Sequence, residues 1–366
     1  MEEKKPREHG LIRIVAFILL FCVLLVSYSY LIRPYFTFKE SFDTLKKEEA
    51  PIDVLFFGGS STLVYWAPLL AFERYGISSY ALSDIAMAPS MMTGLLEETL
   101  PICRPKLYVI DIRAFEHYET DPDTYREGPF RIYTDSMPYS LNRLKTINYS
   151  GQYAPFELSL LTHYFDFIYY HGEWRTLGKL NWKDSVDWNE SPNELYKGYF
   201  MHTLPLSNVT LNAYEEVTEK VSLSEEGVTV LYDLLDYIES KNLPVLFMLN
   251  AYAFENEQER GMYNTIFDIL DQRGFAYLDT NLYYEEMGLD GKTDFYNENH
   301  VNAIGTEKYT DWLAQWLIEH YELEDHSSDA RFDSWWSEVP EFNEKFSSAK
   351  QHYWDQFYAR EDTGAE

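Results

Sequence analysis

The sequence contains a glycine–serine turn of the kind that can present a catalytic nucleophile. Gly58, Gly59, Ser60 and Ser61 directly follow the apolar run VLFF at 54–57. Glycine tolerates the tight turn that lifts a serine hydroxyl to the edge of a sheet, and backbone N–H groups at a helix start can hold an oxyanion. The same residues also suit an ordinary strand-to-helix loop with a serine cap. The lysine of a phosphate-binding P-loop is missing, which argues against a nucleotide.

A second stretch, near the carboxyl end, contains a candidate general base. TDFYNENHVNAIG at 293–305 includes Asp294, Asn297 and His300 and leads into a predicted helix. Histidine is the usual group that takes the proton from an attacking serine. A surface loop with a capping asparagine is the alternative interpretation of this stretch alone. The two stretches together therefore predict serine chemistry only if the fold brings Ser60 and His300 into contact.

The order and spacing of these parts resemble the SGNH (GDSL-type) hydrolases. In that superfamily a G-x-S turn after the first strand pairs with a D-x-x-H motif near the chain end. The closer likeness is to membrane-anchored bacterial members, similar to the proteins of teichoic acid D-alanyl transfer and alginate O-acetylation. It covers about residues 50–322 and includes DSMPYSLNR at 135–143 and KGY at 197–199. The resemblance implies a flavodoxin-like three-layer α/β/α domain with a parallel sheet, preceded by one N-terminal transmembrane helix.

The resemblance also implies roles for individual residues. Ser60 matches the nucleophile and His300 the base, while Asn297 occupies the position of the family's aspartate. An asparagine can orient the imidazole but cannot stabilise imidazolium as a carboxylate does. Asp294 is the nearby carboxylate that would substitute for it.

The oxyanion donors of the family are not present in their usual form. The second predicted strand ends in Ser83 and Asp84, and the third ends in Arg113, where a glycine and an asparagine would be expected. The candidates for oxyanion or substrate contacts, each at the end of a predicted strand, are Gly59, Ser83, Arg113 and Asn250.

Composition and charge exclude several classes of function. The net charge of −30 repels phosphate backbones, so nucleic acid is not an expected partner. With two cysteines, Cys22 and Cys103, a disulfide framework and a cysteine zinc site are not expected. No metal site is visible, and the proposed chemistry needs no cofactor. The aromatic content of 17% suits either sugar stacking or an aromatic core.

An apolar run near the N-terminus predicts a membrane anchor. Residues 14–32 carry no charge, and 19 residues at 1.5 Å each span roughly 28 Å, close to a bilayer core. A cleaved signal peptide is the alternative, but no small-residue cleavage site follows. The basic residues ahead of the run place residues 1–13 in the cytoplasm and the body outside; they are Lys4, Lys5, Arg7 and Arg13.

The elements that would position the site alternate between strands and helices, which predicts a parallel α/β sheet. We expect strands at 54–57, 78–82, 244–249, 275–280 and in PKLYVIDIR (105–113), and helices at 68–75, 90–100, 223–240, 255–273 and 305–321. The predicted organisation is a stalk at 33–52, an SGNH-like domain at 53–322, an aromatic-rich insertion over its carboxyl edge at about 116–222, and a helical acidic tail at 323–366.

The expected function is transfer of an acyl group, in the first instance acetyl, to a cell-envelope or exported polysaccharide. The resemblance implies that a multi-spanning membrane-bound O-acyltransferase delivers the acyl group. A carbohydrate esterase would use the same residues with water as the acceptor. A non-catalytic glycan-binding or scaffold protein that keeps the fold is the third reading, favoured by Asn297 and the missing oxyanion donors.

Overall fold

The structure is a computed structural model of the 366-residue chain. It describes residues 7–34, 36–116, 127–154, 159–172, 195–201, 203–211, 214 and 216–363. Part of the predicted insertion at 116–222 therefore lies outside the described residues.

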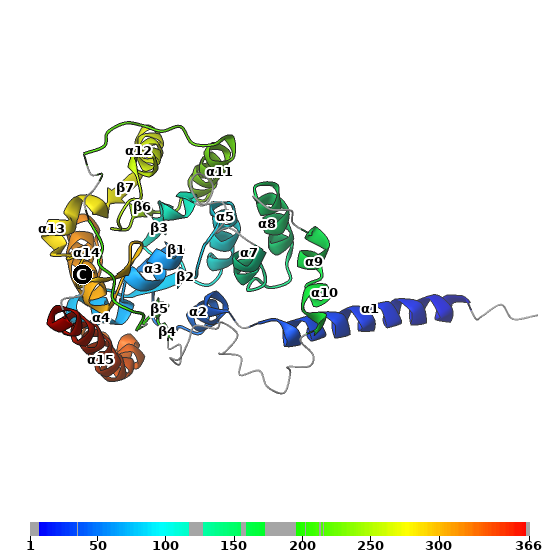
Figure 1. The fold of residues 1–366 in the computed structure, drawn as a ribbon. Coiled ribbons are helices and arrows are strands. Elements are labelled where there is room, and N and C mark those ends of the chain that lie inside the picture. Colours follow the sequence, from blue (N-terminus) through cyan, green and yellow to red (C-terminus); the bar gives the residue numbers. More distant parts are fainter. Residues whose placement is uncertain are drawn as a thin grey trace, which may run out of the picture.

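A five-stranded parallel sheet forms the centre of the body (Figure 1). Its spatial order is β2-β1-β3-β6-β7, and every neighbouring pair runs parallel. Strands of such a sheet are covered on both faces, which explains why they read as continuous apolar runs. The predicted α/β class with a parallel sheet is confirmed. The strands are β1 (Val54–Gly58), β2 (Ser79–Ser83), β3 (Leu107–Asp111), β6 (Val245–Leu249) and β7 (Ala276–Asp279).

Helices cover the two faces of the sheet and divide the core into two hydrophobic clusters. Alternate side chains of β1 point to opposite faces: Leu55 and Phe57 belong to one cluster, and Val54 and Phe56 to the other. The first cluster contains the apolar faces of α5, α11 and α12, and the second those of α3 and α14. Residues of α4 and α13 also belong to these clusters. The bounds of the helices are α3 (Ser60–Tyr65), α4 (Pro68–Tyr75), α5 (Pro89–Thr99), α11 (Glu225–Lys241), α12 (Glu257–Gln272), α13 (Tyr284–Met287) and α14 (Ala303–His320).

Short strands and 3-10 turns lie in the connections between the larger elements. Two small antiparallel sheets pair β4 with β5 and β8 with β9. The first pair is β4 (Leu195–Tyr196) and β5 (Tyr199–Phe200), and the second is β8 (Phe295–Asn297) and β9 (His300–Val301). The 3-10 turns are η1 (Ile112–Phe115), η3 (Thr280–Tyr283) and η4 (Ala330–Phe332).

The acidic tail forms the long helix α15 (Asp333–Thr363), which packs against the body. Trp335, Phe342, Phe346 and Tyr353 on this helix are buried in the first hydrophobic cluster. The helix predicted for the tail is therefore present, and its aromatic side chains belong to the core.

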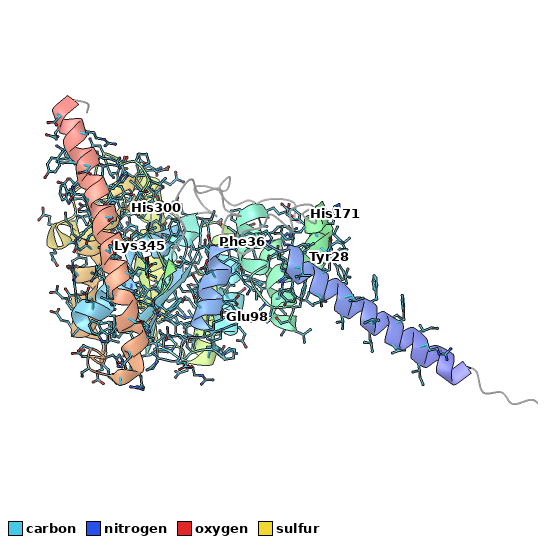
Figure 2. All side chains as sticks on the ribbon, turned by 90° about the horizontal axis from the view of Figure 1, so that it is seen from below. Tyr28, Phe36, Glu98, His171, His300 and Lys345 are labelled. Carbon is cyan, nitrogen blue, oxygen red and sulfur yellow. The ribbon has the colours of Figure 1, made fainter. Side chains whose placement is uncertain are left out.

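One helix projects from the body and is long and apolar enough to cross a membrane. Helix α1 (Arg7–Ile32) contains the apolar stretch Gly10–Ile32, whose side chains are mostly exposed (Figure 2), whereas Ser29 and Ile32 near its carboxyl end are buried. Its 23 residues correspond to roughly 34 Å of helix, enough for a hydrocarbon core of about 30 Å. This arrangement is consistent with a single-pass anchor.

The segment after α1, predicted as a polar stalk at 33–52, requires a correction. It contains helix α2 (Thr37–Leu45), whose residues Phe38, Phe42 and Leu45 are buried in the first hydrophobic cluster. These three side chains recur every three to four residues, which is the spacing of one helix face. The anchor therefore leads directly into a packed part of the body.

Four further helices, of which α10 packs against the end of α1, complete this part of the body: α7 (Glu127–Thr134), α8 (Leu141–Gln152), α9 (Leu160–Tyr164) and α10 (Phe167–Tyr170). Arg33, one residue beyond α1, is buried and forms an ion pair with buried Asp166. Its guanidinium also donates to the carbonyl oxygens of Asp135 at 2.9 Å and Met137 at 3.3 Å. These contacts hold the end of α1 firmly against the body.

Replacing Arg33 with alanine is expected to destabilise the protein by about 3–5 kcal/mol, because it leaves a buried carboxylate without its partner. The matched control is Lys39→Ala, which breaks the partly exposed pair with Asp43 and should cost about 0–1 kcal/mol. Thermal unfolding of both full-length variants in detergent measures the difference. Equal losses would show that the Arg33 contacts do not hold α1 to the body.

Candidate active site

Ser60 lies at the first position of helix α3, directly after strand β1 and the turn residues Gly58 and Gly59. A side chain at position 58 would place its Cβ 2.3 Å from Thr62 Oγ1 and 2.6 Å from Asp111 Cβ. Only glycine allows the turn to pack this closely against β3. The turn therefore fixes Ser60 at the carboxyl edge of the sheet.

His300 comes from the β8–β9 hairpin and contacts Ser60 across the carboxyl edge. Its Nε2 lies 2.7 Å from Ser60 Oγ, and its Nδ1 lies 2.9 Å from Asn297 Oδ1. The ring of Tyr296 stacks on the imidazole, with centroids 5.3 Å apart and an angle of 8° between the planes. The described contacts therefore join Ser60, His300 and Asn297 in one chain of hydrogen bonds.

The asparagine amide is oriented by a neighbouring backbone group. Asn297 Oδ1 also accepts the backbone N–H of Asn299 at 2.9 Å. Because a backbone N–H needs an acceptor, the amide oxygen and not the NH₂ group must face this side. The same oxygen then accepts from His300 Nδ1–H, which leaves Nε2 unprotonated and able to accept the Ser60 proton. The loop thus selects the imidazole tautomer that serine activation requires.

Asp294 is held at the start of α14, and the structure does not support its predicted substitution for the family aspartate. Its carboxylate accepts from Lys308 Nζ at 2.7 Å, Thr293 Oγ1 at 2.8 Å and Asp290 N at 2.8 Å. These bonds are local to the turn before the helix, and Asn297 is the residue bonded to His300 Nδ1. Asp294 therefore stabilises the turn, and Asn297 takes the third position of the site.

The buried carboxylate of Asp111 lies beneath the nucleophile turn. It binds the Ser61 hydroxyl, whereas the Ser60 hydroxyl contacts His300. Asp111 accepts hydrogen bonds from the Ser61 hydroxyl and from Thr62 Oγ1. It also accepts from Asn250 Nδ2 at 3.0 Å and from the Arg113 backbone N–H at 2.9 Å. Burial raises the pKa of Asp111, and these donors oppose that rise. The network fixes the turn from below and leaves Ser60 as the serine facing His300.

The residues predicted to contact an oxyanion, which lie at the strand ends, differ in their hydrogen-bond partners and in their distance along the chain from Ser60. Asn250 is committed to Asp111 and to Tyr309, whose hydroxyl donates to Asn250 Oδ1 at 2.6 Å. Ser83 pairs in register with Gly58 and is buried, and its hydroxyl has no hydrogen-bond partner among the described residues. Gly59 is the N-cap residue of α3 and lies directly beside Ser60.

Arg113 supports the hairpin that carries the histidine. Its Nη1 donates to the carbonyl oxygen of Asn299 at 2.9 Å, and its Nε pairs with Glu116 at 3.1 Å. The guanidinium also lies 4.2 Å from the centroid of the Tyr252 ring. The Tyr65 hydroxyl approaches the same Asn299 carbonyl at 3.3 Å. Arg113 is therefore placed to position the hairpin, a role that its place at a strand end does not reveal.

A cavity of about 180 Å³ opens beside the Ser60 hydroxyl. Its walls are mainly apolar and include Phe200 and Leu204 from the predicted insertion, which thus contributes to the site. The lining residues are Thr37, Ser60, Leu63, Val64, Asp84, Ile85, Phe200, Leu204, Tyr296, Asn297 and His300.

Asp84 is a titratable group of this cavity that we did not single out from the sequence. It is buried, and its carboxylate accepts the backbone N–H groups of Phe38 at 2.7 Å and Ile85 at 2.8 Å. Burial raises its pKa to about 6, although the two N–H groups oppose the rise. Its position after β2 was visible in the sequence, but its contact with the start of α2 was not. Asp84 therefore links the segment after the anchor to the Ser60 cavity.

The raised pKa predicts how stability depends on pH. The folded state binds the Asp84 proton more tightly than the unfolded state, so this contribution is complete below about pH 4 and is lost as pH rises through about 6. From the shift between 3.8 and about 6, wild type should lose about 3 kcal/mol more than Asp84→Asn over this window. Denaturant unfolding at several pH values measures the two slopes. Identical slopes would contradict the predicted shift.

No group of three or more histidine, cysteine, aspartate or glutamate residues that could hold a metal ion occurs in the described part of the chain. The geometry around Ser60 is instead that of a serine, an imidazole and an amide in hydrogen-bonding contact.

Comparison with known proteins identifies no relative of this chain. No protein-family model matches the sequence, and no curated protein matches it. The interpretation of the site therefore depends on its own geometry.

Proposed function

We propose that the protein is an acyl-transfer enzyme of the cell surface that uses Ser60 as its nucleophile. The observation that carries this proposal is the chain from Ser60 Oγ through His300 to Asn297, with distances of 2.7 Å and 2.9 Å. Numbered along the chain, the five sheet strands have the order 2-1-3-4-5, which is that of flavodoxin-like folds and supports an SGNH-type arrangement. A serine and a histidine at the carboxyl edge of such a sheet suit acyl chemistry.

The reaction proceeds in two half-reactions. In the first, Ser60 Oγ attacks the carbonyl carbon of the donor while His300 Nε2 takes the hydroxyl proton, and a tetrahedral oxyanion forms. The oxyanion collapses, the donor's leaving group departs with the proton from His300, and an ester on Ser60 remains. In the second, His300 Nε2 takes the proton of the acceptor hydroxyl as its oxygen attacks this ester, and a second tetrahedral oxyanion forms. The oxyanion collapses, the acyl group stays on the acceptor, and Ser60 Oγ departs with the proton from His300.

We assign the oxyanion to backbone N–H groups at the nucleophile turn. The first N–H groups of a helix have no partner within the helix, and those of α3 start at Ser60. The side chains of Arg113 and Asn250 are already committed to Asn299, Glu116, Asp111 and Tyr309.

The cavity supports a small acyl group as the transferred unit. Its volume of about 180 Å³ is below the roughly 300–1,000 Å³ of pockets for drug-sized ligands. Leu63, Val64 and Ile85 form an apolar wall beside Ser60. This wall suits a methyl group such as that of acetyl and reduces access of water to the ester. Transfer is therefore preferred over hydrolysis in the proposal.

The remaining parts of the proposal concern location and partners. The basic residues ahead of the apolar run at 14–32 favour an N-terminus in the cytoplasm and a body outside the membrane. The acceptor is then a hydroxyl of a cell-envelope or exported polysaccharide. A multi-spanning membrane-bound acyltransferase would supply the acyl group across the bilayer.

The test uses full-length protein in detergent with p-nitrophenyl acetate as donor and short envelope oligosaccharides as acceptors. We expect p-nitrophenol release and acetylated oligosaccharide from wild type, and neither from Ser60→Ala. Ser61→Ala is the matched control and should retain both activities, because its hydroxyl bonds Asp111 beneath the turn. Release of acetate alone with every acceptor would favour the esterase, and inactivity of folded wild type toward all donors would favour the non-catalytic reading.

A further inference from the structure

An exposed apolar surface lies on helices α8, α9 and α10. The largest exposed fractions are those of Leu141 at 77%, Leu161 at 57%, Tyr169 at 47% and Phe165 at 46%. Contiguous exposed apolar side chains on a soluble surface usually mark a site of contact with a partner or a membrane. We call the six side chains of this surface the apolar collar; they are Leu141, Leu144, Leu160, Leu161, Phe165 and Tyr169.

The collar belongs to the helices that hold the end of α1. Helix α10 packs against α1, and the Tyr30 and Tyr139 rings meet edge to face with centroids 5.1 Å apart. The backbone N–H of Tyr139 donates to the Tyr30 hydroxyl at 3.1 Å. Figure 1 shows α8, α9 and α10 on the side of the body from which α1 projects, with α10 beside its last turns. Figure 2 shows Tyr28 of α1 and His171, just after α10, close to each other.

The surface around the collar differs in charge from the rest of the chain. The chain contains 60 aspartate and glutamate residues. Within residues 138–154 and 159–172 the sequence has one acid, Asp166, and it is buried against Arg33. The exposed cation of these ranges is Lys145. The described residues of these two ranges therefore add no exposed carboxylate to the collar, so they do not themselves repel anionic headgroups.

We propose that the apolar collar inserts into the boundary between lipid headgroups and acyl chains. Helix α1 ends at Ile32, and 23 residues of span bring this end to the outer boundary of the hydrocarbon core. Side chains fixed beside its last turns therefore lie at the depth where tyrosine and phenylalanine are enriched in membrane proteins. If α1 crosses a bilayer, the collar beside its carboxyl end contacts the surface of that bilayer. The proposal therefore depends on α1 crossing the membrane.

Insertion of the collar has a consequence for the orientation of the body. A single helix leaves a domain free to tilt, but a second, lateral contact with the bilayer restrains it. Helix α2 follows α1 directly, and its first residue, Thr37, lines the Ser60 cavity. The collar would therefore hold the cavity at a fixed height above the membrane.

The test uses the full-length chain with an environment-sensitive NBD fluorophore on single cysteines. Cys22 and Cys103 are replaced by alanine, and the label is attached at Leu161→Cys or at the matched control Leu282→Cys, whose parent leucine is 56% exposed on η3. Phe165→Cys and Tyr358→Cys form a second pair, in case one substitution disturbs folding. The proteins are reconstituted in vesicles of phosphatidylcholine and phosphatidylglycerol with nitroxide-labelled lipids.

We expect several-fold stronger nitroxide quenching at positions 161 and 165 than at 282 and 358, together with protection from aqueous iodide. A label on native Cys22, which lies in α1, reports separately on the span. Quenching at Cys22 with labels at 161 and 165 as accessible to iodide as those at 282 and 358 would overturn the proposal. Protection of the collar in native membranes but not in these vesicles would also overturn it, in favour of a protein partner.

Discussion

Replacement of His300 by alanine should lower the rate of acylation of Ser60 about 10⁴-fold or more, by analogy with other serine–histidine sites. The Ser60 hydroxyl has its proton acceptor, His300 Nε2, at 2.7 Å, and a neutral hydroxyl is a weak nucleophile without such a base. The measurement is the initial release of p-nitrophenol from p-nitrophenyl acetate. His320→Ala is the control, because this exposed histidine at the end of α14 bonds the carbonyl of Trp316. A His300→Ala variant that keeps the wild-type rate would show that another group activates Ser60.

Two substitutions of Asn297 are expected to change the rate of Ser60 acylation in opposite directions. Asn297→Asp keeps an acceptor for His300 Nδ1–H and for the Asn299 backbone N–H, and adds a charge that stabilises imidazolium. Because a charged hydrogen bond is worth about 1–2 kcal/mol more than a neutral one, the rate should rise about tenfold. Asn297→Leu removes the acceptor and should lower the rate about 10²-fold or more.

The comparison of these two variants tests how the asparagine works. In serine proteases, asparagine in place of the aspartate leaves the imidazole in the wrong tautomer. Here the Asn299 N–H already directs the amide oxygen to His300. The wild-type asparagine therefore supports activity, and the carboxylate of Asn297→Asp should increase it. Kinetics of both variants at several pH values provide the measurement. An equal loss in Asn297→Asp and Asn297→Leu would contradict the assigned tautomer.

The short connection between α1 and α2 gives the Ser60 cavity a structural link to the apolar helix α1. Thr37 at the start of α2 lines the cavity, and Asp84 in its wall accepts the N–H of Phe38 on the same helix. Movement of α1 would therefore reach this wall through the short segment between Ile32 and Thr37.

Much of the sheet and of the nucleophile–base pair could be predicted from the sequence. Buried parallel strands need continuous apolar residues, so β1 and β6 are visible as VLFF and VLFML between polar helices. Ser60 and His300 lie at opposite ends of a long stretch of sequence, but each adjoins a strand or helix terminus at the carboxyl edge. The convergence of such edges allowed their proximity, and the resemblance to the SGNH hydrolases implied it.

The parts that could not be predicted depend on contacts between distant segments. The charged residues of α2 suggested a stalk, although Phe38 and Phe42 on its other face are buried. Asn297 matched the position of the family's aspartate and Asp294 was the possible substitute, and the hydrogen bonds of His300 and Lys308 separate their roles. The apolar collar required knowledge of which side chains remain exposed, since isolated leucines and phenylalanines in the sequence suggest a core.

The central claim is that Ser60, activated by His300, is the nucleophile. Its most direct test is labelling of the folded full-length protein with a fluorophosphonate, followed by peptide mapping, in wild type, Ser60→Ala and Ser61→Ala. We predict that the label is found on Ser60 in wild type, persists in Ser61→Ala and disappears in Ser60→Ala. Absence of labelling in folded wild type, or labelling that Ser60→Ala leaves unchanged, would contradict the claim.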